Sequence, residues 1–155
     1  MKKDILIKQH DMRDCGAACL ASVSAYYGHT MPIAKIRQIC HTDKRGTNAL
    51  GLVQGLEKLG FNAKGVKGNL EALAKIPLPA IAHVIIKEQW QHYVVIYKIE
   101  KEKITVMDPA FGKLETYTFA DFSKVWTGVL ILMEPNEYFE QKNEKTSLYG
   151  RFWNL

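Results

Sequence analysis

Apolar residues recur with a different period in each half of the chain. Between residues 16 and 59 they return every three or four positions, which is the spacing of one buried helix face. This spacing predicts helices over 16–27, 32–40 and 48–59, with a short helix over 70–75. Beyond residue 60, short runs rich in Val, Ile and Tyr predict strands over 61–66, 79–86, 92–99, 103–107, 113–118 and 128–133, with a brief helix over 120–125. Helices followed by an antiparallel sheet define an α+β fold.

Glycine, proline and threonine mark the expected helix ends. Gly28 and Gly60 follow the first and third helices, where glycine tolerates the left-handed conformation that ends a helix. Pro32 stands early in the second helix, where its missing N–H does no harm. Thr47 is a candidate cap for the third helix.

The chain changes character near residue 136. Residues 136–145 are polar and charged, and residues 148–155 turn aromatic. We therefore expect one domain over 1–135 and a linker over 136–155. No internal repeat is evident.

Composition narrows the class of protein. A chain of 155 residues with 47% hydrophobic content has the size and composition of one globular domain. Its apolar run over 129–133 is too short to cross a membrane, and no signal peptide follows the basic start. The net charge of +5 is scattered, which indicates a solvated surface, and no nucleic-acid partner is expected. Three cysteines without a secretory signal favour reduced thiols in a cytosolic setting.

Cys15 is a candidate nucleophile. It stands at the N-terminal edge of the first helix, where the positive end of the helix dipole favours a thiolate. Gly16 beside it would let a substrate backbone approach closely. Gln9, six residues upstream, and the backbone N–H of Cys15 could donate to a developing oxyanion. On position alone, a small core residue is an equally good interpretation of Cys15. Cys19 and Cys40 are read as core residues.

His92 and Asp108 are the candidate base and its orienting group. His92 opens one strand, the next strand ends at Asp108, and a tight turn near residues 100–102 would bring the two nearly opposite each other. A carboxylate there would fix the imidazole, as the third member of a catalytic triad does. Asp108 could equally be a turn residue, and His92 a strand-edge histidine. His83 on the preceding strand is a rival base, because a register shift of one residue would change its face.

These residues resemble the N-terminal peptidase domain of peptidase-containing ABC transporters, the bacteriocin-processing cysteine peptidases. The likeness extends from Ile7 to Pro135. It is carried by the segment from Gln9 to Cys19, by His92-Tyr93-Val94-Val95, by Asp108-Pro109, by Thr47-Asn48-Ala49 with Gly51-Leu52, and by Trp126-Thr127-Gly128.

The resemblance implies a papain-like fold with Cys15 as nucleophile, His92 as base, Asp108 as orienting group and Gln9 in the oxyanion hole. It implies precursors of bacteriocins or lanthipeptides as substrates, cut after a Gly-Gly-type pair that ends the leader peptide. It also implies transmembrane and ATPase domains as partners at the cytoplasmic face of the membrane. This chain would then be an excised peptidase domain that needs no cofactor, with ATP used only by the ATPase domain.

Three alternatives remain at this point. The domain could hold a leader peptide without cutting it, or it could be another acyl-transfer enzyme on the same scaffold. A zinc or redox protein could use Cys15, Cys19, Cys40 and His41, although their spacing lacks a paired C-x-x-C arrangement. Loop-like stretches contain His10, His29 and His41, to which we assign no role.

Overall fold

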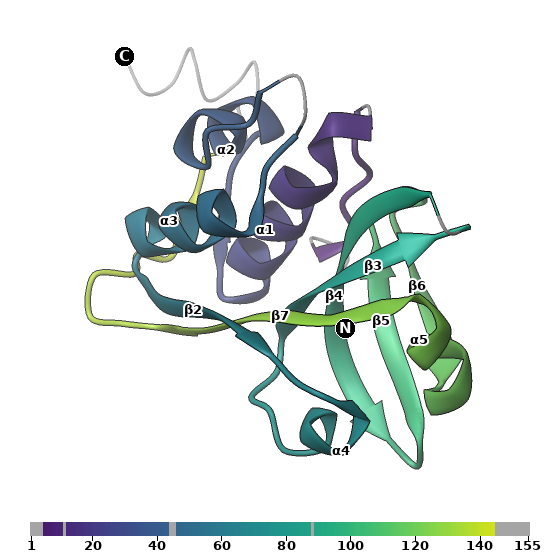
Figure 1. Cartoon of the computed structure of the whole chain (residues 1–155). Coiled ribbons are helices and arrows are strands. Elements are labelled where there is room, and N and C mark those ends of the chain that lie inside the picture. Colours follow the sequence, from purple (N-terminus) through teal and green to yellow (C-terminus); the bar gives the residue numbers. More distant parts are fainter. Residues whose placement is uncertain (1–4, 11, 44–45, 88, 145–155) are drawn as a thin grey trace, which may run out of the picture.

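In the computed structural model, the three N-terminal helices gather on one side of a twisted antiparallel sheet, and two short helices cover its other side (Figure 1). The structure describes residues 5–10, 12–43, 46–87 and 89–144. Every predicted helix and strand is present, and two short strands, β1 and β8, were not predicted. The elements are, in chain order, the 3-10 turn η2 (Met12–Asp14), α1 (Cys15–Tyr26), β1 (His29–Thr30), α2 (Ile33–Ile39), α3 (Ala49–Leu59), β2 (Phe61–Lys67), α4 (Leu70–Leu73), β3 (Ala80–Ile86), β4 (Trp90–Glu100), β5 (Lys103–Asp108), β6 (Lys113–Thr118), α5 (Phe119–Val125), β7 (Trp126–Pro135) and β8 (Lys142–Asn143).

The main sheet has six strands in the order β2-β7-β3-β4-β5-β6, and all its pairings are antiparallel. Its helical side carries one hydrophobic cluster, which joins α1, α2 and α3 to residues such as Ile81 and Val95. The opposite side carries a second cluster, in which Phe122 of α5 and Leu73 of α4 pack against Val94 and its neighbours. The sheet is thus covered on both faces, which explains why its central strands read as continuous apolar runs.

Helix α1 is the central helix of the fold. Residues 15–25 are all buried, and the helix packs against α2, α3 and β4. Most of these residues are Ala, Gly, Ser or Cys, whose small side chains let neighbouring elements approach from every direction. A helix that is apolar all round is one that belongs in a core. Cys15 is therefore fixed in the first turn of a helix that is buried on all sides.

Helix α3 ends as predicted but begins differently. Gly60 adopts φ +100° and closes the helix in the left-handed region. At the other end the cap is Asn48, not Thr47, because the Asn48 side chain accepts a hydrogen bond from the N–H of Gly51 at 2.8 Å. Thr47 is buried and bonds the Thr42 hydroxyl instead, at 2.5 Å.

The β4–β5 hairpin sets the distance between His92 and Asp108. Its turn lies at Lys101 and Glu102, both with positive φ, where the sequence predicted a tight turn. Val95 pairs with Met107 after a register shift near residue 97. Extending this register puts Asp108 level with residue 94, two residues from His92 on the same face, so the two are diagonal neighbours and not directly opposed.

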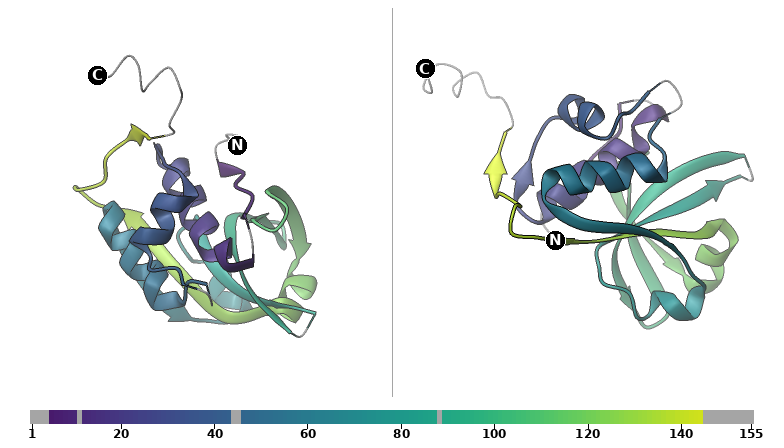
Figure 2. Two further views of the ribbon diagram at one scale, coloured as in Figure 1. Left: turned by 90° about the horizontal axis from the view of Figure 1, so that it is seen from above. Right: turned by 60° about the vertical axis from the view of Figure 1, so that its left-hand side comes forward.

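Residues 136–144, the C-terminal strap, run back along the helical part of the molecule. They contain β8, which pairs in parallel with β1 (Figure 2). Phe139 contacts the rings of Tyr27 and Phe61, and Glu144 bonds both His29 and Lys35. The sequence predicted only a linker here and assigned His29 to a loop. Within the described ranges, no helix is long and apolar enough to span a bilayer.

Candidate active site

A short hydrogen bond joins His92 to Asp108. The ring Nε2 of His92 lies 2.7 Å from Oδ1 of Asp108. The two side chains are only 12% and 6% exposed, so water competes weakly for this bond. Asp108 ends β5, and His92 lies near the start of β4, as the sequence predicted.

The turn after β5 holds the Asp108 carboxylate in place. The backbone N–H of Ala110 donates to the same Oδ1 at 2.9 Å, and the N–H of Gly112 donates to the Asp108 carbonyl at 2.8 Å. Asp108 is thus both a turn residue and the partner of His92. The two interpretations that the sequence left open are compatible, because one carboxylate oxygen serves both bonds.

The protonated form of His92 is favoured although the ring is largely buried. Burial lowers the pKa of His92, but hydrogen bonds with Asp108 and Cys15 outweigh it and raise the pKa from 6.5 to about 9. Since Nε2 is engaged by Asp108, the other ring nitrogen, Nδ1, is the one available to Cys15. The three side chains therefore form a chain of contacts from thiol to imidazole to carboxylate.

A buried ion pair anchors the residue before Cys15. Asp14 is fully buried, and both of its carboxylate oxygens accept from the Arg37 guanidinium, at 2.6 and 2.5 Å. Asp14 also accepts from the backbone N–H of His10 at 3.0 Å. This arrangement fixes the backbone just before α1. It also places the charge of Arg37 next to the acid that precedes Cys15 in the chain. This pair was not predicted, because two charged residues 23 positions apart have no sequence pattern that links them.

Gln9 is held beside His92 through the turn after β5. Its backbone N–H donates to the Pro109 carbonyl at 2.8 Å, and its side chain lines the same groove as His92 and Asp108. Its Oε1 is buried, and no group among the described residues bonds it. A buried polar atom without a partner is rare in proteins and is often found at functional sites.

Gly16 lies against other residues of this protein, whereas the sequence suggested that a substrate backbone would approach it. A Cβ at Gly16 would lie 3.1 Å from the Thr47 side chain and 3.2 Å from Leu52. The glycine therefore lets the segment before α3 pack tightly on the first turn of α1. This contact also gives Thr47 and its neighbours a structural role at the edge of the site.

The remaining cysteines do not converge on Cys15 as a metal site. Cys19 is fully buried one turn along α1, and burial raises the pKa of its thiol well above its ordinary value. Cys40 lies near the Thr42 and Thr47 hydroxyls, and His41 faces Lys58. Among the residues that the structure describes, no three His, Cys, Asp or Glu side chains form a group able to hold a metal ion.

His83 lies on the neighbouring strand without joining the His92–Asp108 pair. It pairs with Tyr93, whereas His92 pairs with Val84, so the two histidines point to opposite faces. The Nδ1 of His83 lies 3.0 Å from the Thr127 hydroxyl, and burial lowers the pKa of its ring. The geometry favours His92 over His83 as the partner of Cys15.

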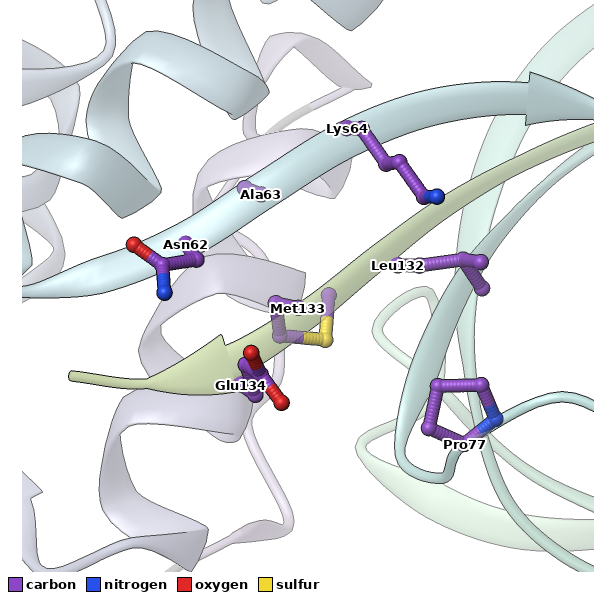
Figure 3. Close-up of a pocket in the computed structure, with 7 residues that line it drawn as sticks. All are labelled: Asn62, Ala63, Lys64, Pro77, Leu132, Met133 and Glu134. Carbon is purple, nitrogen blue, oxygen red and sulfur yellow. The ribbon is translucent and has the colours of Figure 1, made fainter.

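A separate hollow of about 420 Å³ lies over β2 and β7 (Figure 3). It is lined by Asn62, Ala63, Lys64, Pro77, Leu132, Met133 and Glu134. Neither a cysteine nor a histidine is among these side chains. The candidate site is the one where α1, β4 and β5 bring Cys15, His92 and Asp108 together.

This architecture, with helices first, an antiparallel sheet afterwards and a cysteine at the start of the central helix, is the papain-like cysteine peptidase fold. The solved structures that are similar to this chain include the following two. The peptidase domain of Streptococcus ComA, a bi-functional ABC transporter involved in a quorum-sensing pathway, is 37% identical, with a TM-score of 0.77 over 84% of this chain and 97% of that one. A double glycine motif protease from an AMS/PCAT transporter, in complex with the leader peptide, is 30% identical, with a TM-score of 0.77 over 84% and 90%.

The chain belongs to the peptidase C39 family, whose model matches residues 3–138. Among curated relatives, the lactococcin-G-processing and transport ATP-binding protein LagD of Lactococcus lactis is 41% identical over all of this chain and 22% of its own length. The mesentericin-Y105 transport/processing ATP-binding protein MesD of Leuconostoc mesenteroides is 38% identical over 93% of the chain and 20% of its length. The chain thus spans about a fifth of the curated relatives that it matches.

Proposed function

We propose that this domain removes the leader peptide from bacteriocin or lanthipeptide precursors by cutting after a Gly-Gly-type pair, with Cys15 as nucleophile. The observation that carries the proposal is the contact chain from Cys15 through His92 to Asp108. The family membership supports peptidase chemistry, and the relatives named for processing and transport support this substrate class. A leader-peptide complex is known for one structural relative.

Acylation begins with attack of the Cys15 thiolate on the carbonyl carbon of the second glycine. The oxyanion accepts hydrogen bonds from the Gln9 side-chain amide and from the backbone N–H of Cys15, which has no partner within the helix because it lies in the first turn. His92, protonated and oriented by Asp108, gives its Nδ1 proton to the departing amine as the C–N bond breaks. The core peptide leaves, and the leader remains bound as a thioester.

Deacylation returns the site to its starting state. Neutral His92 takes a proton from water, and the resulting hydroxide attacks the thioester carbonyl. The C–S bond breaks, the leader leaves as a carboxylic acid, and Cys15 and His92 are again a thiolate and an imidazolium. The Asp108 carboxylate keeps its charge throughout and acts through the orientation and pKa of His92.

The wider setting is proposed from the same relatives. Since they are transport ATP-binding proteins, we propose that this domain works at the cytoplasmic face of the membrane, beside transmembrane and ATPase domains. In this mechanism the peptidase step uses water, the side chains of Gln9, Cys15, His92 and Asp108 and the backbone N–H of Cys15, and it needs no cofactor.

Cleavage of a synthetic leader–core peptide, followed by mass spectrometry, tests the proposal. We expect wild type and Cys19→Ala to make one cut after the second glycine, and Cys15→Ala to make none. Cys19 is the matched control, because it is a buried thiol on the same helix. Binding of the leader without any cut by wild type would favour a leader-holding module. Transfer of the leader to an added amine in preference to water would favour another acyl-transfer enzyme.

A further inference from the structure

A groove of about 340 Å³ opens beside His92, on the side away from α1. We call it the His92 groove. Cys15 does not line it, although its partner His92 does. Its walls are the tip of the β3–β4 hairpin and the β5–β6 hairpin, with Gln9 at one edge. Its lining includes Ile86, Trp90, Phe111, Glu115 and Tyr117.

Two large aromatic side chains stand exposed in this groove. Trp90 is 52% exposed at the start of β4, and Phe111 is 59% exposed in the turn after Asp108. Both are held on ordered backbone, since Trp90 pairs with Ile86 across the β3–β4 hairpin and the Phe111 N–H donates to the Asp108 carbonyl at 3.1 Å. Large apolar side chains that remain uncovered in a groove mark a binding surface.

The position of the groove defines which part of a substrate it can hold. In the proposed reaction the acyl carbon bonds to Cys15 on α1, while the departing amine must lie within reach of the His92 ring. A peptide in the site therefore runs from Cys15 towards His92 in the direction from leader to core. The His92 groove continues this path, and Gln9 at its edge places it next to the scissile carbonyl.

We propose that the His92 groove binds the first residues of the core peptide and favours an apolar or aromatic side chain among them, through Trp90 and Phe111. This inference rests on the proposed function and adds a specificity determinant on the far side of the cut. Ile86 and Tyr117 extend the apolar wall. Glu115, 3.4 Å from the Tyr117 hydroxyl, and Lys87, whose Nζ lies 5.7 Å from the centre of the Trp90 ring, put one charge of each sign on the walls, so the selectivity rests on the aromatic rings.

Two peptides with the same leader test this inference. One begins its core with four residues that include Phe and Leu, and the other begins with four glycines. We expect wild type to cut the apolar peptide with a kcat/KM about tenfold higher. Trp90→Ala and Phe111→Ala should bring this ratio close to one. Tyr138→Ala, which removes an aromatic ring 75% exposed on the strap, should leave the ratio at its wild-type value.

The outcomes distinguish failure of the groove proposal from failure of the proposed peptidase function. If wild type cuts both peptides at the same rate, or if both groove variants keep the tenfold ratio, the groove does not read the core peptide. If wild type cuts neither peptide, the peptidase function itself is wrong, and this inference is overturned with it. Using two single variants on different hairpins keeps the test decisive if one of them folds poorly.

Discussion

Replacing Asp108 with asparagine would keep the hydrogen bond that orients His92 and remove the charge that stabilises its proton. The Ala110 N–H donates to Oδ1 of Asp108, the atom that contacts His92, so this position requires an acceptor. An asparagine would therefore turn its oxygen, and not its amino group, towards both donors. Asp108→Ala removes the acceptor altogether and is the variant for comparison.

The size of the effect follows from the pKa of His92. A pKa of about 9 in place of 6.5 corresponds to about 3 kcal/mol of stabilisation of the protonated ring. This stabilisation comes from Asp108 and Cys15 and exceeds the cost of burial. If Asp108 supplies half of it, Asp108→Asn lowers the pKa of His92 by at least about one pH unit. Near pH 7 we expect a loss of about tenfold or less for Asp108→Asn, and of about 100-fold or more for Asp108→Ala.

The assay is kcat/KM for leader–core cleavage from about pH 5 to about pH 10. Wild-type activity should fall on the alkaline side near pH 9, as His92 loses the proton that the leaving amine needs. In Asp108→Asn this fall should begin at a lower pH. An alkaline limb at the same pH in both proteins would refute the assignment of Asp108.

The free energy of unfolding should depend on pH through the same side chain, His92. Because the pKa of His92 is higher in the folded state than in the unfolded chain, its contribution is complete below about pH 6.5 and is lost as pH rises through about 9. The free energy of unfolding should therefore decline over this interval, and less steeply in Asp108→Asn. Urea unfolding at several pH values measures it.

Five further substitutions test three other parts of the site and fold. Arg37→Met should lower the free energy of unfolding by about 3–5 kcal/mol, because it leaves the carboxylate of Asp14 buried without its arginine. Asp14→Asn should lower it by less, because the Arg37 side chain is one-third exposed and can still be hydrated. A smaller shift of the urea midpoint in Arg37→Met than in Asp14→Asn would contradict this order. Gln9→Ala should lower kcat by about 100-fold with little change in KM, because it removes a hydrogen-bond donor to the oxyanion. Gln9→Glu keeps the size of the side chain without its N–H donor, so an equal loss there would show that the donor, and not packing, is what matters. Gly60→Ala should destabilise by about 2 kcal/mol or more, because φ is +100° and a Cβ would lie 2.6 Å from the backbone of Phe139; an unchanged melting temperature would show that the strap yields at that point.

The sequence predicted that His92 and Asp108 lie close together, but it predicted little of what surrounds them. His92 and Asp108 come together because hairpin register is fixed by a short turn and an apolar pattern, both of which are local. The left-handed end of α3 at Gly60 follows equally from local backbone chemistry. Asn48 caps α3 in place of Thr47 because the fold buries Thr47. Local sequence patterns do not specify which of the two residues is buried.

Other features depend on contacts between distant and weakly patterned segments. The two-residue strands β1 and β8 are too short to show any period, and β8 lies in a polar stretch that reads as a linker. The Asp14–Arg37 pair joins two charges that would each be expected on the surface. The His92 groove was not predicted, because the exposure of Trp90 and Phe111 is a property of the assembled hairpins.

The strap has a mechanical consequence for the active site. The backbone N–H groups of Lys142 and Glu144 donate to the carbonyls of Gly28 and Thr30, just after α1 ends. With 12 residues and a rise of about 1.5 Å each, α1 separates this attachment from Cys15 by about 18 Å. A pulling force on the strap would therefore act on the domain near the C-terminal end of α1. It would be resisted together by the two backbone hydrogen bonds between the strap and residues 28 and 30. We expect amide exchange in Glu144→Gln to rise around Thr30 while the hydrogen-bonded amides of the second turn of α1 stay protected, so that Cys15 is isolated from a load applied at residue 144.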